Sequence, residues 1–226
     1  MRILAGMEGS WRTIRVLDAD PDQRAALGKL GFAPDLVQRY PPGTRHFDRA
    51  VANLQRTLEE MVRQAITGSA ADWAEALADL ISRAEHVQVP LAVVGSAALA
   101  VRGIEVRPAD IDVMTTPEGA DALADSYEAV LVGPALTIPG FGRFGRAFTS
   151  GIRVEWLGNP PSPLDGPWPL EGARWTIASP FEEVRWKGRI VRVPPLELQR
   201  RIEVSRHRLD RVAAIDDFCA HPQPDR

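Results

Sequence analysis

The chain has 226 residues, of which 45% are hydrophobic and 25% are charged, and these are ordinary values for a globular protein. Its formal net charge of -3 gives no reason to expect broad nonspecific binding to DNA. The single cysteine, Cys219, excludes a disulfide framework. Because the N-terminus lacks the pattern of a signal peptide and no run of about 18 apolar residues occurs, we expect a soluble cytoplasmic protein that does not enter a membrane.

Residues 1–68 are expected to form a mostly helical appendage. Asp20-Pro21 is typical of a helix start, and Gly31 of a helix end. Apolar residues at helical spacing, from Phe47 onward, indicate a longer helix. The predicted elements of this region are a strand at 11–17, a helix at 23–30 and a helix at 47–66.

Residues 69–226 are expected to form a second domain, a small mixed β-sheet with flanking helices and a C-terminal helix. Short apolar strands are interspersed there with helical patterns, which is typical of a mixed α/β core. The predicted helices lie at 72–84, 97–101, 117–127 and 195–218. The predicted strands lie at 89–94, 111–114, 129–132, 146–148, 152–157, 175–177 and 190–193, and the proline-rich stretch 159–169 is expected to be a loop.

Gly95 and Ser96 form a small-residue turn between a predicted strand and an alanine-rich helix. Such a turn lets backbone amides approach an anion closely, and the positive end of the helix dipole favours phosphate. The Ser96 hydroxyl would add one hydrogen bond. Taken alone, the pair is explained at least as well by a tight turn that needs small residues for packing.

Asp110 and Asp112 lie two residues apart on a predicted strand, so both carboxylates face one side while Ile111 and Val113 face the core. Two close carboxylates repel each other unless a cation lies between them. Mg²⁺ prefers a few carboxylates together with phosphate oxygens and water. The alternative is a pair of aspartates on the solvent face of a half-exposed strand.

These two elements, separated by one short helix and a turn, together resemble the nucleotidyltransferase superfamily. Members of that superfamily carry a Gly-Gly or Gly-Ser turn followed by an Asp-x-Asp or Asp-x-Glu pair. The resemblance covers roughly residues 89–157, with weaker similarity as far as 218. It implies that Gly95 and Ser96 hold a nucleoside triphosphate and that Asp110 and Asp112 bind Mg²⁺ or Mn²⁺.

Glu155 is the candidate for the third carboxylate that this superfamily usually carries on a later core strand. In the predicted strand 152–157, Ile152 and Val154 face inward, whereas Arg153 and Glu155 face outward. The resemblance implies that Glu155 is a third metal ligand or the base for the attacking hydroxyl. The alternative is a surface glutamate paired with a neighbouring arginine.

The predicted C-terminal helix offers two further candidates. Superfamily members that modify small molecules or act as toxins often carry a lysine followed later by Arg-x-x-Asp. Arg201 stands where that lysine would fall, and Asp210 ends the stretch Arg206-His-Arg-Leu-Asp210, so the resemblance makes both candidates for nucleotide binding. For most of these charges we favour a solvated helix face with pairs such as Glu203 with His207.

The arginines around the motifs suggest one more nucleotide-binding candidate, Arg102, at the end of the short helix. It belongs to a local basic patch with Arg107, Arg143 and Arg146, which a nucleic-acid acceptor could use. The stretch Gly140–Gly145 matches the dinucleotide-binding fingerprint letter by letter. Because Pro139 precedes it and strand residues follow, a glycine hairpin is favoured instead.

The predicted activity is therefore a metal-dependent nucleotidyltransferase. It would move a nucleoside monophosphate from a nucleoside triphosphate to an acceptor hydroxyl and release pyrophosphate. The resemblance permits a small molecule, a tRNA end or a protein as the acceptor. The alternative is a catalytically inactive protein of the same fold that binds a nucleotide or a partner.

Overall fold

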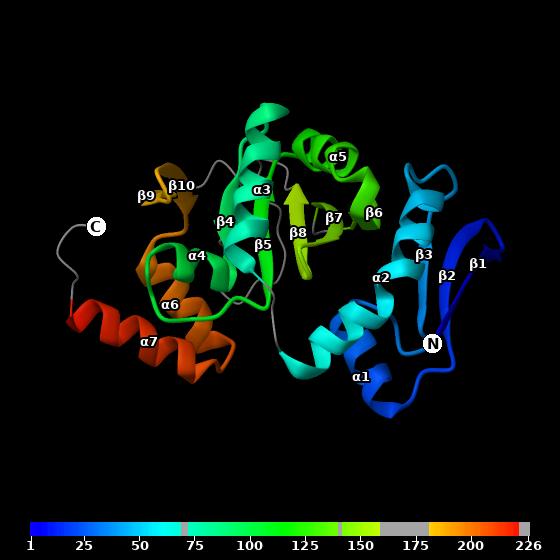
Figure 1. Cartoon of the computed structure of the whole chain (residues 1–226), viewed down its shortest axis with the longest axis horizontal. Coiled ribbons are helices and arrows are strands. Elements are labelled where there is room, and N and C mark those ends of the chain that lie inside the picture. The colour runs from blue at the N-terminus through cyan, green and yellow to red at the C-terminus, as the bar shows by residue number, and fades with distance from the viewer. Residues whose placement is uncertain (69–71, 140–141, 159–180, 222–226) are drawn as a thin grey trace.

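The protein, described here from a computed structural model, has a mixed α/β fold, as predicted. The structure describes residues 1–68, 72–139, 142–158 and 181–221. Over these ranges the strands form one central five-stranded sheet and two smaller sheets, with helices around them (Figure 1). The N-terminal region lies on one side of the central sheet, and the last two helices lie on the other.

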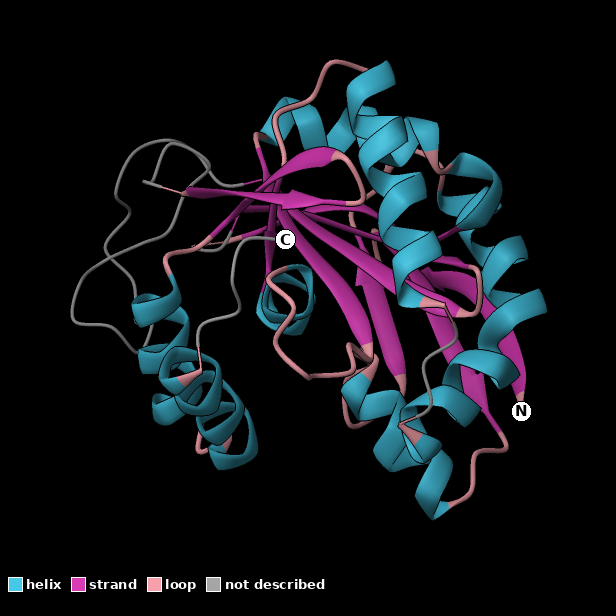
Figure 2. Ribbon diagram, turned by 60° about the vertical axis from the view of Figure 1, so that its left-hand side comes forward, coloured by secondary structure: helices cyan, strands magenta, loops and turns pink. Residues whose placement is uncertain are grey.

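The central sheet has the strand order β4-β5-β8-β7-β6, and Figure 2 shows its twist. Its strands are β4 (Ala92–Val94), β5 (Asp110–Thr115), β6 (Leu131–Ile138), β7 (Gly142–Thr149) and β8 (Ile152–Gly158). β5 and β8 are parallel, whereas the other neighbouring pairs are antiparallel. The antiparallel pairing of β6 with β7 confirms the predicted hairpin, whose residues 140 and 141 lie outside the described part.

One face of this sheet is apolar and carries the main core. Ile111 and Val113 of β5 and Val154 and Trp156 of β8 are buried there against the helices. These helices include α3 (Trp73–His86), α4 (Gly95–Val101) and α5 (Pro117–Ser126), and a 3₁₀ turn, η1 (Glu128–Val130), follows α5. Because side chains alternate along a strand, the residues between these core positions face the opposite side of the sheet.

The helices α3 and α5 begin where the sequence supplies a capping side chain. The Asp72 side chain accepts hydrogen bonds from the amides of Ala74 and Glu75 at the start of α3. The Thr116 hydroxyl accepts one from the Gly119 amide at the start of α5. Such caps satisfy backbone donors that the first turn of a helix leaves without partners.

The N-terminal region combines two helices with a three-stranded antiparallel sheet. The strands are β1 (Arg2–Glu8), β2 (Trp11–Leu17) and β3 (Val37–Tyr40), and the helices are α1 (Pro21–Lys29) and α2 (Phe47–Thr67). The helices hold more residues than the strands, but β1 and β3 are not predicted from the sequence. β1 shows no regular alternation of buried and exposed residues, and β3 has only four residues. Neither strand therefore shows the two-residue alternation by which a strand is recognised in a sequence.

The apolar core of the N-terminal region extends onto the central sheet. Leu54 and Leu58 of α2 belong to the same buried cluster as Val132 of β6 and Phe148 of β7. The buried Asn53 amide donates to the backbone carbonyls of Glu128 and Leu131, at 2.9 and 2.8 Å. The N-terminal region thus packs on one end of the central sheet. The division of the chain into two domains between residues 68 and 69 stays a prediction.

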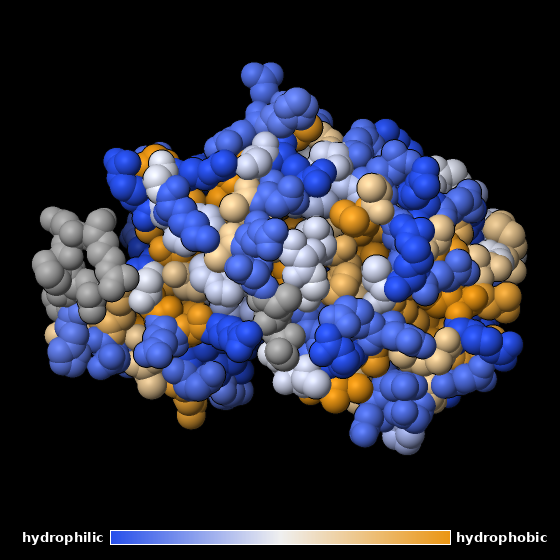
Figure 3. Space-filling view, in the orientation of Figure 1, coloured by the Kyte–Doolittle hydropathy of each residue, from blue (hydrophilic) through white to orange (hydrophobic). Residues whose placement is uncertain are grey.

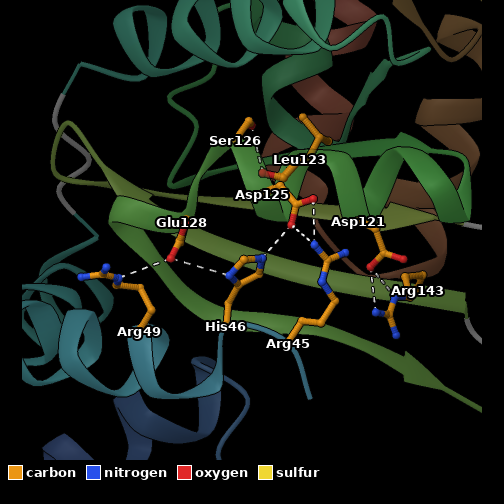
Figure 4. Close-up of polar contacts among 9 residues, drawn as sticks. All are labelled: Arg45, His46, Arg49, Asp121, Leu123, Asp125, Ser126, Glu128 and Arg143. Carbon is orange, nitrogen blue, oxygen red and sulfur yellow. Dashed lines mark hydrogen bonds and ion pairs between the residues drawn. The ribbon is translucent and has the colours of Figure 1, made fainter. Parts of the chain in front are cut away.

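Charged side chains surround this contact. His46 and Arg45, just before α2, both contact Asp125 of α5, and Arg49 contacts Glu128 (Figure 4). Arg49 and Glu128 are more than a third exposed, so this pair adds little to stability. The contacts fix which end of α2 faces α5.

The C-terminal part forms a β-hairpin and two helices, β9 (Glu182–Trp186), β10 (Arg189–Val193), α6 (Leu196–Ser205) and α7 (Leu209–Ala220). The prediction of one continuous helical region at 195–218 is wrong, because two separate helices occupy it. The chain turns between α6 and α7, where His207 adopts a positive φ of 55°. A residue in this left-handed conformation cannot continue an α-helix.

Other predicted boundaries also shift. The strand predicted at 129–132 is β6, which begins at Leu131 and runs to Ile138, and α4 begins at Gly95 rather than at residue 97. The loop predicted at 159–169 and the strand predicted at 175–177 lie outside the described residues.

The surface in the orientation of Figure 1 is largely hydrophilic, with apolar residues between the charged ones (Figure 3). The exposed large apolar residues include Leu4 and Met7 on β1 and Trp11 on β2. In the described part of the chain, no helix combines the length and the apolar character that crossing a membrane requires.

Candidate functional site

The parallel pairing of β5 with β8 brings the predicted carboxylates together. In this register Asp110 lies opposite Arg153, and Asp112 lies opposite Glu155. Side chains at paired positions of neighbouring strands point to the same face, so the three carboxylates and Arg153 share one side of the sheet. This is the side away from Trp156 and the main core.

Two arginines bind the carboxylates of this face. Arg153 donates to Asp110 through Nη2, and its Nε lies 3.0 Å from Oε1 of Glu155. Arg146 of β7 donates from Nε to the same Glu155 oxygen at 2.6 Å. The side chains of Arg146, Arg153 and Glu155 are 12%, 15% and 16% exposed, so these pairs are shielded from solvent far more than surface ion pairs.

The two arginines also reach the N-terminal region. Arg146 Nη1 donates to the carbonyl of Leu30, and Arg153 Nη1 donates to that of Lys29 at 3.3 Å. Both carbonyls lie at the C-terminal end of α1, where the helix dipole is negative and unpaired carbonyl oxygens accept hydrogen bonds. The end of α1 therefore forms part of the wall of the site.

The surroundings of Asp112 raise the pKa of its carboxyl group. Burial, followed by the negative charges of Asp110 and Glu155, raises its pKa to about 7, although Arg153 and Arg206 act in the opposite direction. Burial and the two neighbouring carboxylates together thus outweigh the effect of Arg153 and Arg206 on this pKa. A further cation at this place would relieve the remaining repulsion.

The raised pKa of Asp112 leads to a testable prediction about stability. The pKa of Asp112 is raised from 3.8 to about 7 in the folded protein, so the folded state binds more protons than the unfolded state between these values. Asp112 consequently lowers stability as the pH rises from about 4 to above 7. We expect Asp112→Asn to raise the melting temperature by about 2–6 °C at pH 8, which corresponds to about 1–2 kcal/mol, and to change it little near pH 4.

Thermal unfolding followed by circular dichroism at the two pH values measures this difference. Glu105→Gln, which removes a carboxylate from an exposed position, is the control and should leave both melting temperatures unchanged. A lower melting temperature of Asp112→Asn at pH 8 would contradict the assigned repulsion.

The Gly95-Ser96 turn lies directly against Asp112. Val94 pairs with Asp112 across β4 and β5, and Gly95 follows with a positive φ of 64°. A Cβ added at Gly95 would lie 3.1 Å from Oδ2 of Asp112, so this position has little room for a side chain. Ser96 is buried in the first turn of α4. The predicted turn and the predicted carboxylate pair are thus neighbours.

Carboxylate oxygens are the donors that Mg²⁺ and Mn²⁺ prefer, and Asp110 and Asp112 present them from one face of one strand. The donor chemistry of this pair therefore fits such an ion. Within the described residues, however, no group of three or more acidic, histidine or cysteine side chains is placed to hold a metal. Glu155 lies against Arg146 and Arg153, and its place as a third ligand stays a prediction.

The other nucleotide-binding candidates come from other segments of the chain. Arg102 caps the opposite end of α4, where it contacts Glu182 and donates to the carbonyl of Pro194 at 2.7 Å. Arg201 is exposed on α6, and Asp210 is exposed in the first turn of α7. Their assignment to nucleotide binding stays a prediction.

α6 instead contributes Gln199, which was not predicted, and Glu203, for which the expected solvated face and pairing with His207 are wrong because its side chain is buried beside Arg208 and Arg211. Gln199 is 3% exposed and donates from Nε2 to the carbonyl of Gly95 at 3.1 Å. Glu203 is 2% exposed, and its carboxylate lies 3.5 Å from Arg211 and 3.7 Å from Arg208. Arg206, after the end of α6, lies close enough to influence Asp112. The four-residue spacing of Gln199 and Glu203, which puts both on one helix face, is the signal in the sequence that groups them.

No protein-family model and no curated protein matches the sequence. Among solved structures, the chain is similar in fold to a protein from Thermotoga maritima described as a "putative nucleotidyltransferase", with a TM-score of 0.48, 20% sequence identity, and coverage of 66% of this chain and 93% of that chain.

Proposed function

We propose that this protein is a metal-dependent nucleotidyltransferase that moves a nucleoside monophosphate from a nucleoside triphosphate to an acceptor hydroxyl. The observation that carries the proposal is the pair Asp110 and Asp112 on one face of β5, with the Gly95 backbone packed against Asp112. This arrangement combines a donor set for a divalent ion with a small-residue turn beside it. Both suit the binding of a triphosphate together with a divalent ion.

In the proposed reaction, the acceptor oxygen forms a bond to the α-phosphorus while the bond from that phosphorus to the β-phosphate bridging oxygen breaks. Pyrophosphate leaves with the electron pair of that bond, and the hydroxyl proton passes to a carboxylate, for which Glu155 is the candidate. A Mg²⁺ or Mn²⁺ ion, when bound, would neutralise charge on the triphosphate and on the leaving group.

The protein's own residues would hold and orient the reacting groups. Asp110 and Asp112 provide the ligand oxygens, and their shared strand keeps them on one side of the sheet. Gly95 leaves the backbone open to close approach beside Asp112, and Gln199 holds the carbonyl of Gly95 from the side of α6. Arg146 and Arg153 keep Glu155 in place next to Asp112.

A transfer assay tests this proposal. The full chain is incubated with each labelled nucleoside triphosphate and Mg²⁺ or Mn²⁺, in separate reactions with pools of small hydroxylated molecules, tRNA and proteins. Label transferred to one pool, with equal release of pyrophosphate, supports the activity and identifies the acceptor class. Absence of transfer and of pyrophosphate release in every pool contradicts it.

One observation favours the alternative of a binding module without catalysis. Glu155, the candidate base, is engaged by two guanidinium groups, and this occupies a carboxylate oxygen that a base or metal ligand would use. Triphosphate binding detected by calorimetry, without transfer in any pool, would support that alternative.

A further inference from the structure

We infer that Arg153 is a built-in competitor of the divalent metal ion, and that the ion must displace its guanidinium from Asp110 in order to bind. This inference rests on the proposed function, because it concerns the same carboxylates. It assigns to Arg153 control over how tightly the site takes up a metal ion.

Arg153 lies among the carboxylates of the site. It is opposite Asp110 in the strand register, donates to an Asp110 oxygen, and also lies against Glu155. An arginine guanidinium is always protonated in proteins, and this one lies directly against the carboxylates of Asp110 and Glu155. The cluster therefore contains a permanent positive charge at the place where a metal ion would act.

A guanidinium and a metal ion would compete for the same carboxylate of Asp110. Each uses a lone pair of a carboxylate oxygen, and two positive charges within one half-buried cluster repel each other. The side chains of Asp110 and Arg153 are only 24% and 15% exposed, so water screens this repulsion weakly. Binding of the ion and pairing of Arg153 with Asp110 therefore oppose each other.

Arg153 also has a hydrogen-bond partner outside the carboxylates. Its Nη1 donates to the carbonyl of Lys29 at the C-terminal end of α1, 3.3 Å away. The neighbouring carbonyl of Leu30 binds Arg146 in the same way. The negative end of α1 thus offers a displaced guanidinium a favourable place beside the site. Through this contact the N-terminal region takes part in the exchange of Arg153 for a metal ion at Asp110.

Removal of Arg153 is therefore expected to tighten metal binding. The experiment titrates Mn²⁺ into metal-stripped full-length protein at pH 8 and constant ionic strength, and measures free Mn²⁺ by electron paramagnetic resonance. Arg153→Gln should lower the Kd for Mn²⁺ at least about tenfold, which corresponds to about 1.4 kcal/mol. Arg153→Lys should lower it less, since an ammonium keeps the charge but cannot form the guanidinium fork.

Arg143→Gln is the matched control. Arg143 lies on β7, is half-buried, and pairs with Asp121 of α5 at 2.7 Å on the other face of the sheet (Figure 4). Its loss removes one arginine charge without touching the cluster, so the Kd should stay within about twofold. The double variant Asp110→Asn, Arg153→Gln should bind no tighter than Asp110→Asn alone, because the competition acts through Asp110.

The outcomes separate the two proposals. If the unchanged protein binds Mn²⁺ and neither Arg153 variant binds it more tightly, the inference is overturned and the proposed function stands. If neither the unchanged protein nor the Arg153 variants bind Mn²⁺, both are overturned. Circular dichroism confirms that each variant is folded, and Arg153→Lys provides the answer if Arg153→Gln does not fold.

Discussion

Asp112→Asn is expected to lower the rate of nucleotidyl transfer by about a thousandfold or more, although the same change stabilises the fold. The amide has no negative charge and is a weaker ligand for a divalent ion, so the proposed metal site loses one of its two strand ligands. A thousandfold loss corresponds to about 4 kcal/mol of transition-state stabilisation. Asp110→Asn should show a loss of similar size, because both carboxylates face the same side of β5.

The measurement is the initial rate of label transfer to the acceptor pool that responds in the assay, at saturating triphosphate and metal. Glu105→Gln, at an exposed position away from the strand, should retain the full rate. Full activity of either aspartate variant would falsify the assignment of the metal site. Opposite changes in rate and stability also distinguish a functional role of Asp112 from a structural one, since a structural residue would lose both together.

Trp156→Ala is expected to destabilise the protein by about 3–5 kcal/mol, the largest effect that we predict for one core position. Trp156 is fully buried in the main core, and its ring stacks on Tyr127 with centroids 5.6 Å apart. The ring also lies over Gly145 of β7, where an added Cβ would come within 2.4 Å of the indole nitrogen. The indole thus fills space that no neighbouring side chain can take over, so its removal leaves a large cavity.

Chemical denaturation measures the free energy of unfolding for this prediction. Trp156→Phe is the matched variant and should cost clearly less, because the indole N–H has no hydrogen-bond partner within the described residues and an aromatic ring remains against Tyr127. A loss below about 1 kcal/mol for Trp156→Ala would contradict the assigned packing.

Trp156 also connects the core with the candidate site. It follows Glu155 on β8, and the two side chains project to opposite faces of the sheet. The packing of the indole fixes the position of β8 and therefore the register that places Glu155 beside Asp112. The apolar face of the sheet thus determines the geometry of the charged face.

Much of the local structure could be predicted from the sequence. The long helix α2 begins at Phe47 as its apolar spacing indicates, and β2 spans the predicted residues. The Asp110-x-Asp112 pair lies on a strand with both carboxylates on one face, and Gly95-Ser96 lies at the start of a helix, as predicted. Periodicity, caps and glycines report on neighbours within a few residues, and these neighbours are visible in the sequence.

The partners of the charged residues could not be predicted in the same way. Sequence reasoning placed Arg153 and Glu155 together on the outer face of a strand, but the parallel register that sets Arg153 opposite Asp110 joins residues 43 positions apart. The contact of Arg153 with the carbonyl of Lys29 spans 124 positions. The turn at His207, which ends α6 and begins a separate helix, likewise has no marker in the helical spacing of the sequence.

The sequence by itself therefore determined the donor atoms: two carboxylates on one strand face, a small-residue turn before them, and a third carboxylate on a later strand. Only the tertiary structure decided which charges these carboxylates meet, namely Arg153 and Arg146 held by the end of α1, and Gln199 behind Gly95. The physical reason is that side-chain alternation is a local property of the backbone, whereas strand register and helix packing depend on how distant segments bury their apolar faces together.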